Sequence, residues 1–286
     1  MALSVQIEPT NLLLDHYPRR AWKLVLDMFG TAQDLIFLFG DSITQAGFSQ
    51  DQGFGWVAAL ASDYVRKLNV VNAGLGGYNT RKGLYKLPIL LPPPEHARIR
   101  ILTIFFGAND SRLPNTSQPT QDVPIEEYKA NLKSIVLHPL VKAHGARIIL
   151  ITPPPIDERM CEHTDRTTKG IYEVRRTAES TSRYAQAVRD VSKELNVVHL
   201  DIWSAFMKKA GWKFGEPLMG SKAVPQNFET GLPSLLSDGL HLTAKGNRLV
   251  YEELMRLLQD TWPDQTPEAL PRTLPGWDDV EAWKDL

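Results

Sequence analysis

LIFLFGDSIT, at residues 35–44, is the stretch of sequence that decides the fold predicted for this chain. Its first five residues are apolar, which favours a strand buried on both faces in a parallel sheet. Asp41 and Ser42 follow, and the pattern at residues 56–61 then indicates a helix. Open α/β sheets bind ligands at the carboxyl ends of their strands, so Ser42 lies where a nucleophile would be presented. The alternative is that Asp41 and Ser42 only cap the following segment.

Four more apolar runs alternate with helical patterns along the chain. They predict strands at residues 68–72, 101–106, 147–152 and 197–200. Apolar residues at helical spacing predict helices at residues 125–136, 184–195 and 250–258. Pro139 predicts a break just after the first of these helices. Five strands that alternate with helices imply the α/β class, with a mainly parallel five-stranded sheet between two layers of helices.

Two long segments show little apolar pattern. Residues 156–182 are polar, and residues 211–237 are rich in glycine and proline, so both are predicted as connections. Long loops in compact domains are often functional, which makes residues 211–237 a candidate wall of a substrate pocket.

We predict one domain, at residues 34–258, with an extension at each end. In the N-terminal extension, residues 1–33, the apolar side chains of residues 22–29 keep helical spacing and predict a short amphipathic helix. The C-terminal extension, residues 259–286, is rich in proline and tryptophan. Its prolines exclude a helix until residues 277–283, where a final turn or two of helix is expected.

The charge balance excludes several classes of function. The 32 Lys and Arg residues offset 33 Asp and Glu residues, for a net charge of −1, whereas binding to nucleic acid or an anionic membrane surface needs a basic excess. No apolar run approaches the ~20 residues that span a bilayer, and the N-terminus lacks the pattern of a secretory signal. Cys161, the single cysteine, excludes an internal disulfide. We therefore expect a cytoplasmic protein that acts on a small molecule; a homo-oligomer is left open.

Two other kinds of ligand site are considered and set aside. The glycine-rich segment at residues 73–80 could cradle a phosphate, but Asn79 stands where a G-x-G-x-x-G loop needs its last glycine. A tight turn, or an N–H aimed at an oxyanion, fits this segment better. Cys161 and His163 lack the further ligands that a metal would need, and His199 inside a predicted strand is interpreted as a core histidine. We expect no cofactor and no metal.

Serine chemistry accounts for a larger set of polar residues. Hydrolysis by a serine requires a base, a group that orients the base, and donors for the tetrahedral oxyanion. Asp238 and His241 form a local pair in which the carboxylate could fix the imidazole tautomer through Nδ1, which leaves Nε2 for Ser42. Asn109 follows the strand predicted at residues 101–106, so we expect its amide at the same edge of the sheet as Ser42.

Four blocks in this order resemble the GDSL esterases, also called SGNH hydrolases. The blocks are residues 40–43 (GDSI), 72–77 (NAGLGG), 107–110 (GAND) and 238–241 (DGLH). The similarity extends over residues 34–258, and the segments at residues 39–45 and 152–158 are similar to the isoamyl acetate-hydrolysing esterase branch of that family.

The resemblance implies a flavodoxin-like three-layer α/β/α sandwich and a metal-free serine esterase. Carried over block by block, it makes Ser42 the nucleophile, His241 the base and Asp238 the residue that orients the base.

The resemblance also implies an oxyanion hole. Its donors would be the backbone N–H groups of Ser42 and Gly77 and the side-chain amide of Asn109. Gly76 stands where the family often has serine or alanine, so the choice between Gly76 and Gly77 stays open, with Gly77 favoured.

Within this chemistry the leading hypothesis is an esterase that acts on small acyl esters, acetyl esters of simple alcohols first. A lysophospholipase, a thioesterase or a carbohydrate acetylesterase would use the same residues, and the loops at residues 111–122, 156–182 and 211–237 would decide between them. A non-catalytic binding module on the same fold is a further alternative, although every catalytic position is filled. A nucleotide-binding protein is disfavoured because the phosphate-loop spacing is missing.

Overall fold

The structure is a computed structural model that describes residues 33–51, 53–116 and 120–284. In this part of the chain five parallel strands form one sheet, in the order β2-β1-β3-β4-β5. They are β1 (Leu35–Gly40), β2 (Asn69–Gly74), β3 (Ile99–Phe105), β4 (Arg147–Ile151) and β5 (Val198–Leu200). This is the strand order of flavodoxin-like folds, so the predicted fold class is confirmed.

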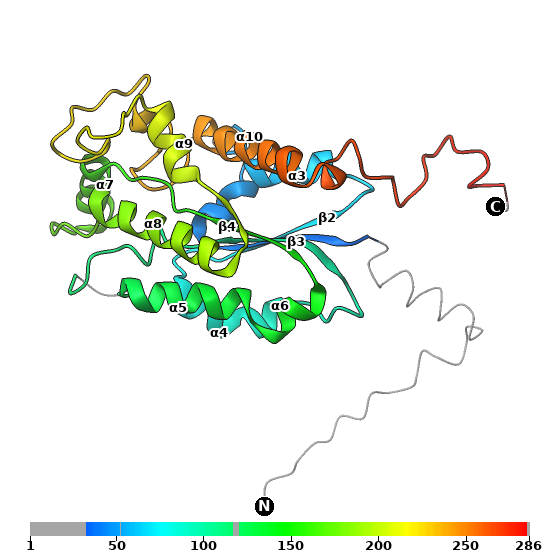
Figure 1. Cartoon of the computed structure of the whole chain (residues 1–286). Coiled ribbons are helices and arrows are strands. Elements are labelled where there is room, and N and C mark those ends of the chain that lie inside the picture. Colours follow the sequence, from blue (N-terminus) through cyan, green and yellow to red (C-terminus); the bar gives the residue numbers. More distant parts are fainter. Residues whose placement is uncertain (1–32, 52, 117–119, 285–286) are drawn as a thin grey trace, which may run out of the picture.

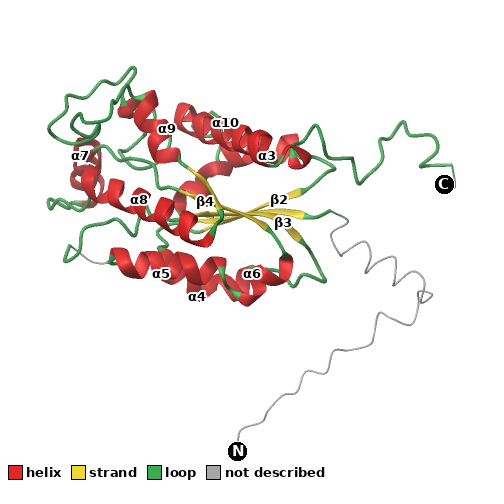
Figure 2. Cartoon of the chain, in the orientation of Figure 1, coloured by secondary structure: helices red, strands yellow, loops and turns green. Residues whose placement is uncertain are grey.

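Helices cover both faces of the sheet (Figures 1 and 2). One face is covered by α3 (Trp56–Asp63), α9 (Ile202–Lys209) and α10 (Ala244–Thr261). The other is covered by α4 (Thr80–Leu90), α5 (Ile125–Val136), α6 (Pro139–His144) and α8 (Ala178–Leu195). The short α2 (Ser42–Gln45) follows β1, and α7 (Glu158–Lys169) lies beyond the carboxyl ends of the strands. Single 3₁₀ turns form at η1 (Ala46–Phe48), η2 (Leu232–Ser234) and η3 (Pro263–Gln265).

Alternation along β1 divides the hydrophobic core into two layers. Ile36 and Leu38 pack into a cluster with side chains of α3, α9 and α10. Phe37 and Phe39 pack into a second cluster with side chains of α4, α5, α6 and α8. Because successive side chains of a strand point to opposite faces, an unbroken apolar run is what such a central strand requires. The prediction made from residues 35–39 is confirmed.

The other long apolar patterns are confirmed with small shifts at their ends. The predicted helices at residues 125–136, 184–195 and 250–258 lie in α5, α8 and α10, and Pro139 is the first residue of α6, so the chain does break after α5. None of the helices in the described ranges has the length and apolar character needed to cross a membrane.

Sequence patterns did not reveal several of the helices, among them α4, α7 and α9. α7 lies within residues 156–182, where the prediction of an irregular connection is wrong. Its apolar side chains are only Met160 and Cys161, too few for a series of apolar residues at helical spacing. Asp157 caps its start by accepting a hydrogen bond from the Met160 N–H (2.9 Å), and Gly170, with φ of +64°, ends it. α4 carries Pro88 in its last turn and α9 is short, which hides both.

The structure tests the expectation made for one of the two ends of the chain. The helix predicted at residues 22–29 lies outside the described residues. At residues 277–283 the chain forms turns, and the expected helix is wrong; Trp277 is 86% exposed, so no apolar face is buried there to stabilise a helix. The preceding part of the tail packs beside α3, where the Tyr64 hydroxyl donates to the Gln265 carbonyl (2.7 Å).

The arrangement of strands beside β1 creates the crevice in which the polar residues meet. β1 pairs with β2 on one side and with β3 on the other, and the connections leave these strands in opposite directions. The Asp41 N–H donates to the Phe105 carbonyl (3.3 Å), which holds the two strand ends together. Ser42 follows β1 and Asn109 follows β3, so the structure places both at the carboxyl edge of the sheet.

Candidate active site

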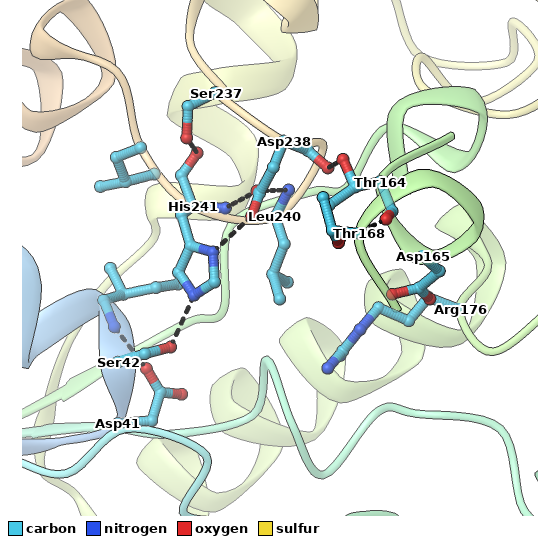
Figure 3. A network of polar contacts seen from close by, with 12 residues as sticks. Asp41, Ser42, Thr164, Asp165, Thr168, Arg176, Ser237, Asp238, Leu240 and His241 are labelled. Atoms are coloured by element: carbon cyan, nitrogen blue, oxygen red, sulfur yellow. Dashed lines mark hydrogen bonds and ion pairs between the residues drawn. The ribbon is translucent and has the colours of Figure 1, made fainter. Parts of the chain in front are cut away.

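Ser42, His241 and Asp238 form a chain of hydrogen bonds (Figure 3). Ser42 Oγ lies 2.9 Å from His241 Nε2, and His241 Nδ1 lies 2.7 Å from Asp238 Oδ2. Because the carboxylate can only accept, it favours the tautomer with the proton on Nδ1, which leaves Nε2 to accept the Ser42 proton. The structure thus brings together the three side chains that the sequence predicts for serine chemistry.

The loop that carries Asp238 also fixes its orientation. Asp238 Oδ1 accepts hydrogen bonds from the backbone N–H groups of Leu240 (2.9 Å) and His241 (2.7 Å). Burial alone would raise the pKa of Asp238, but the hydrogen bonds from the His241 ring and from these N–H groups hold that pKa well below its usual range. Asp238 is therefore an ionised acceptor behind the imidazole.

Gly239 allows this loop to approach α7 closely. Its φ is +88°, and a Cβ at this position would lie 2.6 Å from the Asp157 carbonyl oxygen and from the Cys161 nitrogen. The Asp157 N–H donates to the Gly239 carbonyl (2.9 Å). A side chain would push the loop away from the start of α7, so the glycine of the DGLH block is required for packing.

Asp41 and Ser42 do different things at the end of β1. Asp41 caps α2, since its Oδ1 accepts a hydrogen bond from the Ile43 N–H (2.9 Å). Ser42 is the first residue of α2, and its hydroxyl contacts His241 instead. The capping interpretation is correct for Asp41 alone. Because a first-turn N–H has no acceptor inside its helix, the Ser42 N–H is available to a ligand.

The two candidate glycines differ in what their N–H groups contact. The Gly76 N–H donates to Gln45 Oε1 (2.7 Å). The Gly77 N–H makes no hydrogen bond within the described part of the chain, and Gly77 has a φ of +74°. Gln121 Nε2 donates to the Gly77 carbonyl (3.1 Å) and so restrains the turn. Of the two N–H groups, that of Gly77 is the one left for a bound oxygen.

Asn109 is buried, and both ends of its amide are engaged. Nδ2 donates to the Tyr78 carbonyl (2.8 Å), directly after Gly77, and Oδ1 accepts from Arg176 Nη2 (3.2 Å). A primary amide nitrogen carries two hydrogens, so one N–H of Asn109 remains. The amide thus connects the glycine turn to a buried guanidinium.

Arg176 is the residue of this site that sequence reasoning missed. It lies in the connection between α7 and α8, and its Nη1 also donates to the Ala108 carbonyl. In Figure 3 its side chain extends from beside Asp165 toward the space next to Ser42 and His241. The cap of α8 could have been found from its sequence, but nothing in the spacing relates position 176 to the GAND block.

His241 lines two cavities. The larger, about 260 Å³, is lined mainly by α7, by Arg176 and by Gln121. The smaller, about 180 Å³, is lined by residues of α2, η1 and α10 together with Ser237. Ser237 is the one residue of segment 211–237 that reaches these two cavities, whereas other residues of that segment line a separate space of about 100 Å³. Segment 211–237 therefore contributes little to these cavities, and α7 contributes part of the wall of the larger one.

Cys161, His163 and His199, which were set aside, have different surroundings. Cys161 is buried in the wall of the larger cavity, and burial raises the pKa of its thiol to about 12. His163 is exposed on α7, and His199 Nδ1 lies 3.0 Å from Ser192 Oγ. Among the described residues no three His, Cys, Asp or Glu side chains gather in a way that could hold a metal ion.

Comparisons of sequence place the chain in one family. The family model of the GDSL-like lipases/acylhydrolases matches residues 36–254. A GDSL esterase/lipase of Arabidopsis thaliana is 37% identical over 250 residues, which cover 86% of this chain and 93% of that protein. The isoamyl acetate-hydrolyzing esterase 1 homolog of Homo sapiens is 38% identical over 251 residues, which cover 87% of this chain and 89% of that protein. The chain belongs to the GDSL-like lipase/acylhydrolase family.

Solved structures share the fold. An acetyl xylan esterase superposes with a TM-score of 0.58 at 19% identity, covering 78% of this chain and 99% of that one. The lipase/acylhydrolase of Enterococcus faecalis superposes with a TM-score of 0.55 at 22% identity, covering 85% and 100%. These structures support the flavodoxin-like α/β fold. The family membership and the esterases among its relatives make the chain a carboxylic ester hydrolase.

Proposed function

We propose that the chain is a serine esterase that hydrolyses small carboxylic esters, acetyl esters of simple alcohols above all, through an acyl-enzyme intermediate. The observation that carries the proposal is the chain of hydrogen bonds from Ser42 through His241 to Asp238, beside unused N–H groups at Ser42 and Gly77. The similarity to isoamyl acetate-hydrolyzing esterase 1 homologs supports an acetyl ester of a short alcohol as the substrate.

In the first half of the proposed reaction, Ser42 Oγ attacks the ester carbon while His241 Nε2, 2.9 Å away, takes the hydroxyl proton. The ionised Asp238 stabilises the imidazolium that forms. The bond to the alcohol oxygen then breaks as His241 returns the proton to that oxygen, which leaves the acyl group on Ser42.

In the second half, His241 removes a proton from a water molecule, which attacks the acyl carbon. The Ser42 oxygen leaves and regains its proton from the imidazolium, so the carboxylic acid is released and the enzyme returns to its starting state. No group other than water is needed to complete the cycle.

Charge develops on the carbonyl oxygen in both halves. The proposed donors to that oxygen are the N–H groups of Ser42 and Gly77 and the remaining N–H of Asn109 Nδ2. Each belongs to a turn or a helix start that is already held by other hydrogen bonds. Preorganised donors of this kind stabilise the transition state without rearrangement during the reaction.

The size of the cavities supports short acyl groups. At about 260 and 180 Å³, the two spaces that His241 lines are smaller than the ~300–1,000 Å³ typical of pockets for drug-sized ligands. We therefore expect acetyl to butyryl esters to fit and octanoyl or longer esters to fit poorly.

A series of p-nitrophenyl esters from acetyl to decanoyl tests the proposal. kcat/KM should be highest for acetyl to butyryl and should fall from octanoyl onward. Ser42→Ala, measured on the same series, gives the background hydrolysis to be subtracted. A kcat/KM that climbs steadily with acyl length would refute the preference for small esters and favour a lipase or lysophospholipase.

A further inference from the structure

Arg176 is a buried cation whose hydrogen-bond partners are uncharged. It is 9% exposed, and its two terminal nitrogens donate to the Ala108 carbonyl and to Asn109 Oδ1. Buried charges are usually paired with opposite charges, because removal from water is unfavourable. Asp165 lines the same cavity, but its carboxylate accepts hydrogen bonds from Arg175 and Lys169 instead. The Arg176 guanidinium is thus directed at the turn that carries Asn109.

The backbone around this arginine is attached to the same turn. The Leu113 N–H donates to the Arg175 carbonyl (2.9 Å), and Ser180 Oγ, in the first turn of α8, donates to the Ser111 carbonyl (2.7 Å). These bonds tie the start of α8 to the turn after β3. The guanidinium is therefore held at a fixed position relative to the Asn109 amide.

Contact with a guanidinium decides which way the amide faces. A guanidinium only donates hydrogen bonds, so the amide group facing Arg176 must be the oxygen. This orients Nδ2 of Asn109 toward the glycine turn, where one hydrogen reaches the Tyr78 carbonyl (2.8 Å). A charge-assisted bond to the amide oxygen also draws electron density from the nitrogen, so the remaining N–H becomes a stronger donor.

We propose that Arg176 is a positioning residue of the oxyanion hole: it holds the Asn109 amide in its donating orientation and strengthens its free N–H. The proposal rests on the esterase function proposed above. Arg176 does not touch the ester and acts through Asn109, so its effect is made in the transition state. Burial lowers the pKa of Arg176, yet a guanidinium keeps its proton at neutral pH, so this effect does not depend on titration.

Arg176→Gln tests this role, with Arg175→Gln as the matched control. With p-nitrophenyl acetate we expect Arg176→Gln to lower kcat by about 10- to 100-fold with little change in KM, since one oxyanion-hole donor contributes on the order of 10²–10³. Arg176→Lys keeps the charge and should restore part of the loss. Arg175 is also 9% exposed and lines the same cavity, but it pairs with Asp165. Arg175→Gln removes a cation from the same cavity without touching Asn109, so it should lower the melting temperature and lower kcat far less than Arg176→Gln does.

A double-mutant cycle separates positioning from a general structural effect. Asn109→Ala alone should lower kcat by on the order of 10²–10³. Adding Arg176→Gln to Asn109→Ala should cause no further loss, because the group through which the arginine acts is gone. A double variant whose loss equals the product of the two single losses would overturn the proposal. So would an Arg176→Gln enzyme with the kcat of the wild type.

Titration of the active sites separates a loss of kcat from a loss of folded enzyme. A fluorophosphonate probe, reacted to completion, measures the fraction of competent enzyme in each preparation, so that kcat refers to folded protein. If Arg176→Gln does not fold, Arg176→Lys carries the test: a kcat equal to that of the wild type overturns the positioning role. A wild-type chain that neither hydrolyses p-nitrophenyl acetate nor reacts with the probe would instead overturn the esterase function itself.

Discussion

The proposed active site has a base side, His241, and an oxyanion side, Asn109. On each side, a charged side chain forms a hydrogen bond with the group that would contact the ester. Behind His241 lies Asp238, and behind Asn109 lies Arg176. The two charges are opposite in sign. They match the charges that ester hydrolysis creates, which are positive on the imidazole and negative on the carbonyl oxygen.

The two sides differ in burial, and the difference follows from their chemistry. His241 and Asp238 are both partly exposed, which suits the proposed base, since it would exchange protons with an alcohol and with water. The Asn109 amide keeps its protons throughout, so it and Arg176 can be buried, where a charge is less screened by water. Substitutions on the base side should therefore impair proton transfer, and substitutions on the oxyanion side should reduce electrostatic stabilisation of the transition state.

Asp238→Asn, on the base side, should lower kcat more than Asn109→Ala, on the oxyanion side. We expect kcat to fall by on the order of 10⁴, because an amide at this position can donate to Nδ1 and so stabilise the wrong imidazole tautomer. This exceeds the ~10²–10³ expected for Asn109→Ala on the oxyanion side. Steady-state kinetics with p-nitrophenyl acetate measures kcat for both variants. Asp165→Asn, which removes another carboxylate from the same cavity, serves as the control. If Asp238→Asn costs no more than Asn109→Ala, another group orients His241.

Asp41→Asn should have the smallest effect of these substitutions, and it should change the pH dependence of stability. Burial raises the pKa of Asp41 to about 7, so between about pH 4 and pH 7 the folded chain holds a proton that the unfolded chain has lost. Stability should therefore fall as the pH rises through this range and level off above it. Asparagine mimics the protonated carboxyl and should remove that part of the slope.

Thermal melts of the wild type and Asp41→Asn at pH 5, 6, 7 and 8 measure this difference. Asp110, whose pKa burial raises to about 6, should leave a residual slope that ends near pH 6 in both proteins. If the melting temperatures of the two proteins change in parallel with pH over the whole range, Asp41 is ionised in the folded chain. Ser42 would then have a second negative charge nearby, in addition to that of Asp238.

Local relationships along the chain explain what could be predicted. β1 is buried on both faces, so its apolar run is continuous, and Asp238 lies only three positions from His241. Each pattern falls within one short segment, where period and spacing carry the information. The same holds for the cap of α2, in which Asp41 serves the helix and Ser42 does not.

Tertiary contacts explain what could not be predicted. α7 is a polar helix that contributes to a cavity wall, and its two apolar side chains, Met160 and Cys161, are adjacent, so no series of apolar residues at helical spacing reveals it. Arg176 reaches Asn109 from a connection 67 positions away, through a contact that exists only once α8 is packed against the turn after β3. No single-sequence pattern encodes such a pair. The choice of Gly77 over Gly76 likewise depends on Gln45, which comes from another segment.

Reaction with a fluorophosphonate probe, followed by intact-mass and peptide analysis, tests most directly whether Ser42 is a nucleophile activated by His241. The wild-type chain should gain a single adduct located on Ser42, His241→Ala should react far more slowly, and Ser42→Ala should remain unlabelled. Equal labelling of the wild type and Ser42→Ala, or an adduct on any other residue, would contradict the proposed mechanism.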